Sequence, residues 1–174
     1  MYTIRPCTPE DAPGVVAVAR ATWRATYEGI LPEEVQKQAL SQWYAPELIA
    51  RRAAEGRIVF LVATDVAGQV VGYIQFGPRE TPGDAELWAI YVLPEHQGRG
   101  IGRRLLDEAI ARLRQRRPVE RVYVQVEREN RIGRGFYERL GFRQVREYED
   151  EIFGHSSPMV EMCLTLPAAV EPAT

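Results

Sequence analysis

The amino-acid sequence predicts a mixed α/β fold, with a central, mostly antiparallel sheet of about seven strands flanked by about four helices. Three observations support this fold class. Short β-rich runs alternate with helical patterns, an antiparallel meander leads into a β-α-β unit, and neither a repeat nor a linker divides the 174 residues. We expect one domain over residues 1–166 and a disordered tail over residues 167–174.

The first half of the chain predicts a strand, three helices and a hairpin. Thr8 supplies an N-cap and Pro9 suits the first position of a helix, while Gly29 ends the helix that follows. Each shorter helix also begins at a proline, and Gly68 turns one β-rich run into the next. The expected elements are the strand Tyr2–Pro6, the helices Pro9–Tyr27, Pro32–Leu40 and Pro46–Glu55, and the strands Arg57–Asp65 and Gln69–Phe76.

The second half begins with a loop over Gly77–Asp84, which contains two prolines. Apolar residues then recur at every fourth position of one long segment, as an amphipathic helix requires, and Gly141 stands where a later helix should stop. The expected elements are the strand Ala85–Val92, the helix Gly100–Arg117, the strand Arg121–Val126, the helix Asn130–Leu140, and the strands Phe142–Glu149 and Met159–Leu166.

Composition is that of an ordinary globular protein, with 45% hydrophobic and 26% charged residues. The net charge of −2 argues against a general nucleic-acid binder, and no apolar run is long enough to span a bilayer. The N-terminus has no apolar core of a secretion signal, so we expect a cytoplasmic protein. Cys7, Cys163, His96 and His155 show no metal-ligand spacing, so we expect no metal and reduced cysteines.

The segment Ala85–Leu106 carries the chemistry, because a glycine-rich loop there joins a strand directly to a helix. Glycines at 98, 100 and 102 allow an anion to approach main-chain amides at a helix N-terminus, and nearby arginines add donors. The nucleoside-triphosphate loop would need a lysine, and the dinucleotide fingerprint would need glycine in place of Arg103. The pattern indicates a different pyrophosphate cradle, or a turn that only connects strand to helix.

Two motifs resolve this choice by resemblance. Gln97-Gly98-Arg99-Gly100-Ile101-Gly102 resembles the [QR]xxGx[GA] pattern of the GNAT superfamily of N-acetyltransferases, small bacterial type. The run Asn130 to Phe142 is similar to the family's later signature, N-x(6)-Y-x(3)-GF, and one helix and one strand separate the two motifs as in the family. The resemblance covers residues 58–142 well and implies acetyl-CoA as co-substrate.

The resemblance also implies roles at the site. The Val92 N–H would donate to the thioester carbonyl, the loop would hold the diphosphate, and Asn130 would anchor the pantetheine arm. Tyr137 matches the tyrosine that serves as general acid in many relatives. The implied cofactor-binding residues are Ile90, Tyr91, Val92, Gln97, Gly98, Arg99, Gly100, Ile101, Gly102, Arg103, Asn130 and Tyr137.

The general base is predicted less directly. Glu86 occupies the position of a strand glutamate that takes the amine proton in histone-type relatives, and it would otherwise be an exposed carboxylate at the start of a strand. Strand alternation places Glu86, Trp88, Ile90 and Val92 on one face. Gln125 stands where ribosomal-protein acetyltransferases carry a glutamate that acts as the general base. Glutamine cannot take a proton, which disfavours that subgroup.

The acceptor is expected to be the primary amine of a small molecule, polyamine-like or amino-acid-like, because the run Trp23 to Pro32 resembles small bacterial relatives. Alternatives are a protein or peptide acetyltransferase, a non-catalytic acyl-CoA sensor and a mononucleotide-binding domain. The family resemblance further implies a homodimer. The candidates for the acceptor pocket are Trp23, Tyr27, Glu28 and Trp88, with Phe76 and Phe153 as further aromatic residues.

Overall fold

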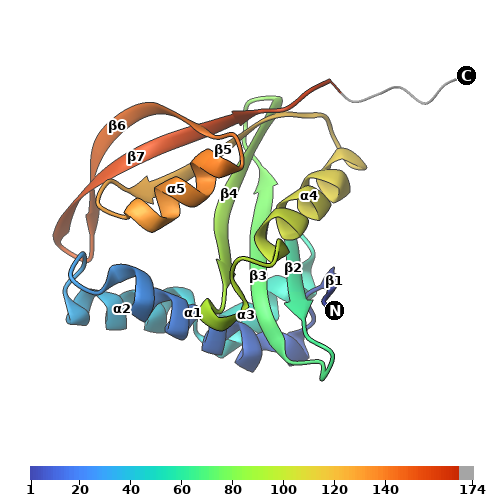
Figure 1. The fold of residues 1–174 in the computed structure, drawn as a ribbon, viewed down its shortest axis with the longest axis horizontal. Helices are drawn as coiled ribbons and strands as arrows, with labels where there is room; N and C mark the ends of the chain where they lie inside the picture. The colour runs from blue at the N-terminus through green and yellow to red at the C-terminus, as the bar shows by residue number, and fades with distance from the viewer. Residues whose placement is uncertain (169–174) are drawn as a thin grey trace, which may run out of the picture.

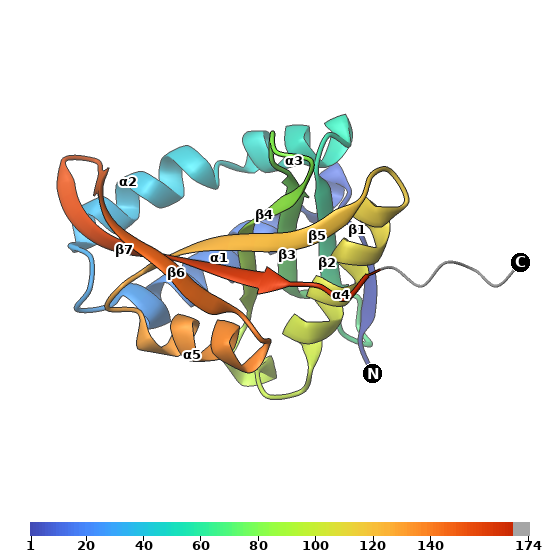
Figure 2. The ribbon, with the colours of Figure 1, turned by 90° about the horizontal axis from the view of Figure 1, so that it is seen from above.

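The computed structural model describes residues 1–168, which form a seven-stranded sheet with helices on both faces (Figures 1 and 2). The strands are β1 (Thr3–Pro6), β2 (Val59–Thr64), β3 (Val70–Pro78), β4 (Gly83–Val92), β5 (Val119–Glu127), β6 (Arg143–Ile152) and β7 (His155–Thr165). The helices are α1 (Ala12–Tyr27), α2 (Glu33–Trp43), α3 (Pro46–Glu55), α4 (Ile101–Arg114) and α5 (Arg131–Arg139), with the 3₁₀ turns η1 (Pro9–Asp11) and η2 (Pro94–His96).

The strand order is β1-β2-β3-β4-β5-β7-β6, and only the β4–β5 pair is parallel. Helix α4 makes the crossover between those two strands, as a parallel connection requires. Strand β7 lies between β5 and β6, so the last hairpin adds its edge strand outermost. The expected mixed fold with about seven strands is confirmed, with five α-helices over residues 1–168 instead of about four.

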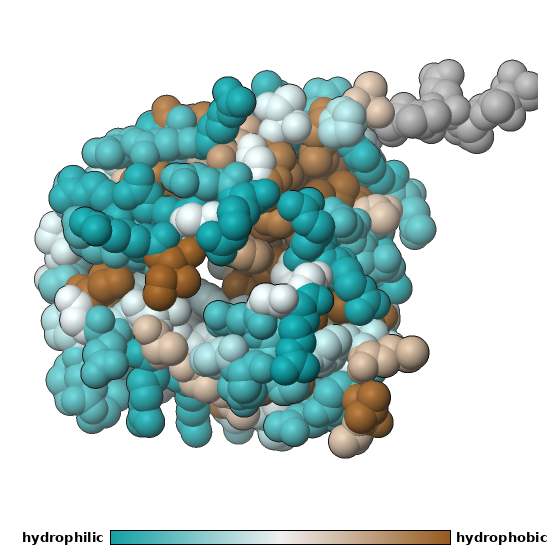
Figure 3. All heavy atoms as spheres, in the orientation of Figure 1, coloured by the Kyte–Doolittle hydropathy of each residue, from teal (hydrophilic) through white to brown (hydrophobic). Residues whose placement is uncertain are grey.

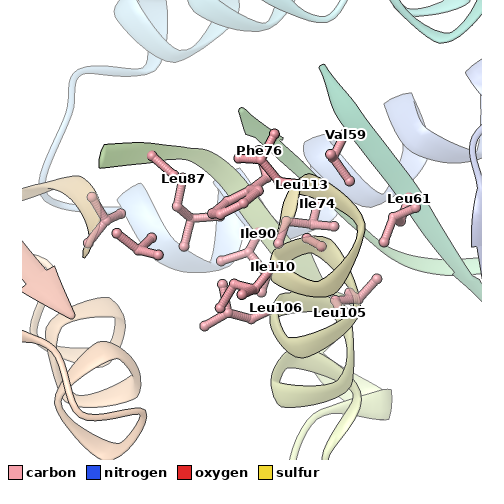
Figure 4. Close-up of a cluster of buried hydrophobic side chains, with 14 of the residues drawn as sticks. Val59, Leu61, Ile74, Phe76, Leu87, Ile90, Leu105, Leu106, Ile110 and Leu113 are labelled. Carbon is pink, nitrogen blue, oxygen red and sulfur yellow. The ribbon is translucent and has the colours of Figure 1, made fainter. Parts of the chain in front are cut away.

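One hydrophobic core lies between the sheet and helix α4 (Figure 4). The apolar stripe of α4, which includes Leu105, Leu106 and Leu113, packs on Ile74 of β3 and Leu87 of β4. Complete burial of a leucine side chain stabilises the fold by about 1.5–3 kcal/mol. This packing fixes the start of α4 against the end of β4, where the glycine-rich loop joins them.

A second core covers the opposite face, under α1, α2 and α3. Val15, Val18 and Trp23 of α1 pack there against Val62 of β2 and Tyr73 of β3. Figure 2 shows α2 and α3 on this side of the sheet and α4 and α5 on the other. The sheet is therefore the middle of three layers, and its two faces carry different helices.

The start of α1 differs from the prediction, because Pro9–Asp11 forms a 3₁₀ turn and the α-helix begins at Ala12. Pro13 has no N–H to give the Pro9 carbonyl, and the Ala12 N–H pairs with that carbonyl instead. The segment 77–84, expected to be a loop, is half strand: β3 continues to Pro78 and β4 begins at Gly83, so only residues 79–82 connect them.

The last hairpin is longer and tighter than expected, because only Phe153 and Gly154 separate β6 from β7. Both residues have positive φ, 49° and 78°, as in the two-residue turns that suit a twisted hairpin. His155, expected in a flexible turn, lies in β7. Pro158 lies within β7, which continues past it to Thr165. The expected disordered tail falls mostly on residues 169–174, which lie outside the described residues.

No helix in the described part of the chain is long and apolar enough to cross a membrane.

Candidate functional site

A cavity of about 480 Å³ opens where β4 and β5 separate. Residues 83–87 of β4 pair with residues 119–124 of β5, whereas residues 89–92 pair with β3 alone among the described residues. Beyond the separation, β5 continues against β7. Figure 3 shows the surface hollowed between α5, α1 and β4. One edge of β4 therefore faces a cavity instead of a neighbouring strand.

A β-bulge at Trp88 sets which side chains face this opening. Gln75 pairs with Ala89 and Phe76 pairs with Leu87, so Trp88 is an extra residue in β4. The predicted alternation was wrong beyond the bulge. Ile90 lies on the α4 face with Leu87, whereas Ala89 lies on the α1 face. Glu86 does not share a face with Ile90 and Val92, although Glu86 and Trp88 do line one pocket.

The Val92 peptide faces the opening. The Leu93 N–H donates to the Val71 carbonyl of β3, and the Tyr91 carbonyl also points toward β3 at Gly72. In a strand, the N–H and C=O of one residue point to the same edge, and those of the next residue point to the opposite edge. Because Tyr91 and Leu93 direct these groups at β3, the Val92 N–H and C=O point away from β3. The Gln97 Nε2 donates to the Val92 carbonyl at 3.0 Å, which leaves the N–H directed at the cavity.

The loop after β4 has the shape of an anion cradle. Gly98 and Gly100 have φ of 76° and 78°, in the left-handed region that glycine adopts without strain, and a Cβ at either position would meet no atom within 4 Å. Within residues 1–168, the amides from Gly98 to Arg103 have no hydrogen-bond partner. These unpaired amides at the start of α4, with Arg103 beside them, fit a diphosphate.

The cavity brings together most of the predicted cofactor residues, and Arg99 is the exception. It lines no part of the cavity; its Nη1 donates to the Tyr2 Oη at 3.0 Å and its Nη2 to the Glu95 carbonyl. The Tyr2 Oη also lies 2.8 Å from His96 Nδ1. The Arg99 side chain therefore ties the loop to β1 instead of lining the cavity, and only its main-chain amide remains as a donor in the cradle.

Helix α5 supplies the opposite wall through Asn130 and Tyr137. Asn130 is buried and caps the helix, accepting from the Gly133 N–H at 2.8 Å, and a Cβ at Gly133 would fall 2.5 Å from its Nδ2. Tyr137 packs between Phe136 and Phe142 and lines the cavity. Burial raises the pKa of the Tyr137 phenol, so this hydroxyl keeps its proton at neutral pH.

The predicted acceptor residues divide into two groups. Tyr27 and Trp88 line the cavity. Trp23 instead lies in the core under α1, its ring 4.6 Å from that of Tyr27, and Glu28 is exposed beyond the end of α1 and lines no described pocket. Of the further aromatics, Phe76 lies fully buried in the α4 core, and Phe153 packs on Trp43 of α2 with ring centroids 5.4 Å apart.

Glu86 lines a second pocket that adjoins the cavity. Its carboxylate accepts from the Gln125 Nε2 at 3.2 Å and lies 3.4 Å from the Arg79 Nε. Burial raises the pKa of the Glu86 carboxyl, which makes it a better proton acceptor than an exposed glutamate. Glu86 is therefore buried and paired, contrary to the interpretation as an exposed carboxylate.

Sequence analysis missed several residues of the cavity wall, including Thr22 and Thr26 of α1 and Ile132 and Phe136 of α5. The one available signal for Thr22 was its place on the apolar face of α1. Phe136 explains Gly102, because a Cβ at Gly102 would lie 2.8 Å from the Phe136 ring. Sequence spacing does not show this contact, since it joins two helices.

Comparisons with known proteins agree with this geometry. Spermidine N(1)-acetyltransferase of Thermoplasma acidophilum is 32% identical over 145 residues, covering 80% of this chain and 87% of that protein. Mycothiol acetyltransferase of Salinispora tropica is 39% identical over 109 residues, covering 58% of this chain, and the match spans only 34% of that longer protein. The crystal structure of PaiA N-acetyltransferase from Thermoplasma acidophilum in complex with coenzyme A superposes with a TM-score of 0.76 at 27% identity, covering 92% of this chain and 98% of that one.

The model of the acetyltransferase (GNAT) family matches residues 16–142, which include the cradle loop and the α5 signature. This match covers most of the chain and takes in both motifs that led to the same family. The chain therefore belongs to the GNAT family of acetyltransferases.

Proposed function

We propose that this chain moves the acetyl group of acetyl-CoA to a primary amine of a small molecule, by direct attack in a ternary complex within a single domain over residues 1–166. One observation carries the proposal. A single cavity is lined by Val92, whose N–H points away from β3, by Gly98 and residues 100–103, whose amides have no partner within residues 1–168, and by Tyr137. These groups are a hydrogen-bond donor for a carbonyl, a cradle for a diphosphate and a proton donor.

The cofactor residues act by position. The amides from Gly98 to Arg103 bind the diphosphate, and the free edge of β4 at residues 90–92 pairs with the amides of the pantetheine arm as an added strand would. Asn130 contacts that arm from the α5 side. Bound in this way, the thioester carbonyl meets the Val92 N–H, where negative charge develops during attack.

The reaction joins the amine nitrogen to the thioester carbonyl carbon and breaks the bond between that carbon and sulfur. The acceptor enters mostly as an ammonium ion and must lose one proton before its lone pair can attack. It loses a second as the amide forms, and the thiolate of coenzyme A takes up one. The balance is one amide, one thiol and one proton released to solvent.

Tyr137 donates the proton that the thiolate receives. Its phenol is protonated at neutral pH, since burial raises its pKa further above the ordinary value, and Tyr137 lines the cavity on the α5 side, opposite β4. Glu86 accepts the amine proton from the adjoining pocket, through water, because its carboxylate is separated from the cavity by Gln125 and Trp88. The raised pKa of Glu86, caused mainly by burial, suits this task.

The names of relatives support a small-molecule acceptor. Relatives at 32% and 39% identity are a spermidine and a mycothiol acetyltransferase, and both of those acceptors are small molecules. The contact of Phe153 with Trp43 joins the β6–β7 hairpin to α2.

Two measurements test the proposal. Calorimetry should show that coenzyme A binds the folded chain in preference to ATP; tighter binding of ATP would instead support a mononucleotide-binding domain. Release of free thiol from acetyl-CoA, followed over a library of amines and peptides, should then identify acceptors. A chain that binds acetyl-CoA but acetylates no member of a broad library would support the acyl-CoA sensor, and a chain that acetylates only peptides would support the protein acetyltransferase.

A further inference from the structure

A second, open pocket of about 710 Å³ is lined by residues of β4, β5, β6 and β7 and of the segment 78–81. It meets the cofactor cavity at two residues, since Trp88 and Gln125 line both spaces. A molecule that extends from the β4–β5 opening away from the cradle loop must pass between these two side chains. The pocket therefore lies on the path that an acceptor would take to the thioester.

Charge in the pocket is unbalanced. Its lining includes four carboxylates, those of Glu80, Asp84, Glu86 and Glu161, and two guanidinium groups, those of Arg79 and Arg146. Arg121, outside the lining, pairs with Asp84 at 2.8 Å and offsets one of the four. An excess of negative charge remains, and partial enclosure makes such an excess more effective on a bound cation than it would be in open water.

The two arginines of the pocket are already engaged. Arg79 lies 3.4 Å from carboxylate oxygens of both Glu86 and Glu161, and its guanidinium stacks 4.2 Å above the Tyr123 ring. The Nε of Arg146 lies 3.2 Å from the Glu161 Oε1, and its guanidinium lies 4.4 Å from the centre of the Tyr148 ring. Each arginine therefore offsets carboxylate charge within the pocket, and the negative charge that remains disfavours an acceptor that carries a carboxylate.

Glu161 is buried and remains charged. Burial opposes its ionisation, but hydrogen bonds from Gln125 at 2.9 Å and from Arg146 outweigh that effect, so the pKa of Glu161 lies below its ordinary value. Because an ionised carboxylate has about four acceptor sites, Glu161 can accept a further hydrogen bond from an ammonium group at the wall of the pocket.

Trp88 gives the junction between the two spaces an aromatic wall. The bulge makes it the extra residue of β4, and the side chain is 50% exposed although its neighbours Leu87 and Ala89 are buried. Its indole lies across Gly77, where a Cβ would fall 2.7 Å from the ring. An exposed indole face attracts an alkylammonium ion by about 0.5–2 kcal/mol.

We propose that this pocket is the distal subsite of the acceptor, and that the acceptor is an elongated diamine or polyamine. Its reacting amine lies at the junction formed by Trp88 and Gln125, and its second ammonium group is held by the carboxylates on the far side, Glu161 foremost. The assignment rests on the proposed function and adds the class of substrate and the residues that select it.

The test compares α,ω-diamines of increasing length with the monoamine and the ω-amino acid of each length, by thiol release with saturating acetyl-CoA. We expect kcat/KM for the best diamine to exceed that of the matched monoamine at least tenfold, with the ω-amino acid poorest. Glu161→Gln should raise KM for the diamine about tenfold and change the monoamine less than twofold, because one charged hydrogen bond is worth about 1.5–3 kcal/mol. Glu147→Gln removes an equal charge from the other face of β6 and should change neither.

Equal rates for diamine and monoamine, preference for the amino acid, or an equal effect of Glu161→Gln on both amines would overturn the subsite. Calorimetric titration of diamine into the coenzyme A complex provides a readout without turnover. Coenzyme A binding with no diamine binding contradicts the subsite alone, whereas absence of coenzyme A binding contradicts the proposed function. Trp88→Leu, at the junction, should weaken diamine and monoamine alike.

Discussion

Gly100→Ala is the sharpest test of the cradle loop. Gly100 has φ of 78°, and a Cβ there would meet no atom within 4 Å, so the substitution adds backbone strain without a clash inside the protein. The left-handed conformation costs a non-glycine residue about 1–2 kcal/mol. Within the described residues the loop amides have no partner, and the loop is held through the side chains of Gln97 and Arg99, so we expect the backbone at residue 100 to relax when the site is empty.

The strain must then be restored when coenzyme A binds. A free-energy change of about 1–2 kcal/mol corresponds to a Kd that rises about fivefold to thirtyfold, which calorimetry resolves. The midpoint of thermal unfolding should change little. An affinity within twofold of the wild type, in a variant with an unchanged circular dichroism spectrum, would refute the assignment of the loop as a diphosphate cradle.

Gly56→Ala is the matched control. Gly56 ends α3 with φ of 63°, and a Cβ there also meets no atom within 4 Å, but Gly56 lines neither pocket. The same strain of about 1–2 kcal/mol should appear as lost stability, with a Tm lower by about 2–8 °C and an unchanged Kd for coenzyme A. A higher Kd for coenzyme A in Gly100→Ala, together with a lower Tm in Gly56→Ala, would distinguish the cradle loop from an ordinary turn.

Three further perturbations have defined outcomes. Tyr137→Phe keeps the aromatic packing and removes the proton donor, so kcat should fall about a hundredfold or more with coenzyme A affinity nearly unchanged; a loss under threefold would remove Tyr137 from the chemistry. Asp11→Asn breaks the pair with Arg5, whose hydrogen bond lowers the pKa of Asp11, so about 1–2 kcal/mol of stability should be lost at neutral pH. This stabilisation exists above the unfolded-state pKa of about 3.9 and is lost as pH falls through the lower folded-state value, so the difference in urea unfolding should shrink as pH is lowered below about 3.9; a constant difference would contradict the pairing. Leu105→Ala, at a fully buried position, should lower the free energy of unfolding by about 2–5 kcal/mol in the same assay, and a loss below about 1 kcal/mol would contradict the packing of α4.

Much of the fold follows from local sequence patterns. The stripe of α4, with Leu105 and Leu113 on one face, and the proline at the start of α3 predicted those helices within a few residues. The misplaced boundaries have local causes that spacing does not reveal. Pro13 delays α1 through a missing N–H, and Phe153 adopts positive φ in a turn usually made by glycine or asparagine.

The candidate site was predictable where a motif is contiguous and was not where it depends on contacts between elements. Gly98 and Gly100 follow from the loop pattern, whereas the orientation of Arg99 depends on Tyr2 at the far end of the chain. Whether Glu86 shares a face with Ile90 depends on the bulge at Trp88, because one inserted residue reverses the direction of every later side chain of the strand.

The acceptor pocket was the least accessible to sequence reasoning. Glu161 and Arg79 are 82 residues apart in the sequence and meet only because β7 inserts between β5 and β6. Nothing in the spacing of these two residues predicts that they line one space. Trp23, by contrast, is an aromatic residue on an amphipathic helix, and it lies in the core as such residues usually do.

A crystal structure with acetyl-CoA bound tests the central claim most directly. The account predicts diphosphate oxygens within about 3 Å of the amides from Gly98 to Arg103, and the thioester carbonyl at hydrogen-bond distance from the Val92 N–H. It also predicts the sulfur atom beside the Tyr137 hydroxyl. A cofactor bound elsewhere, or a thioester directed away from the opening between β4 and β5, would contradict it.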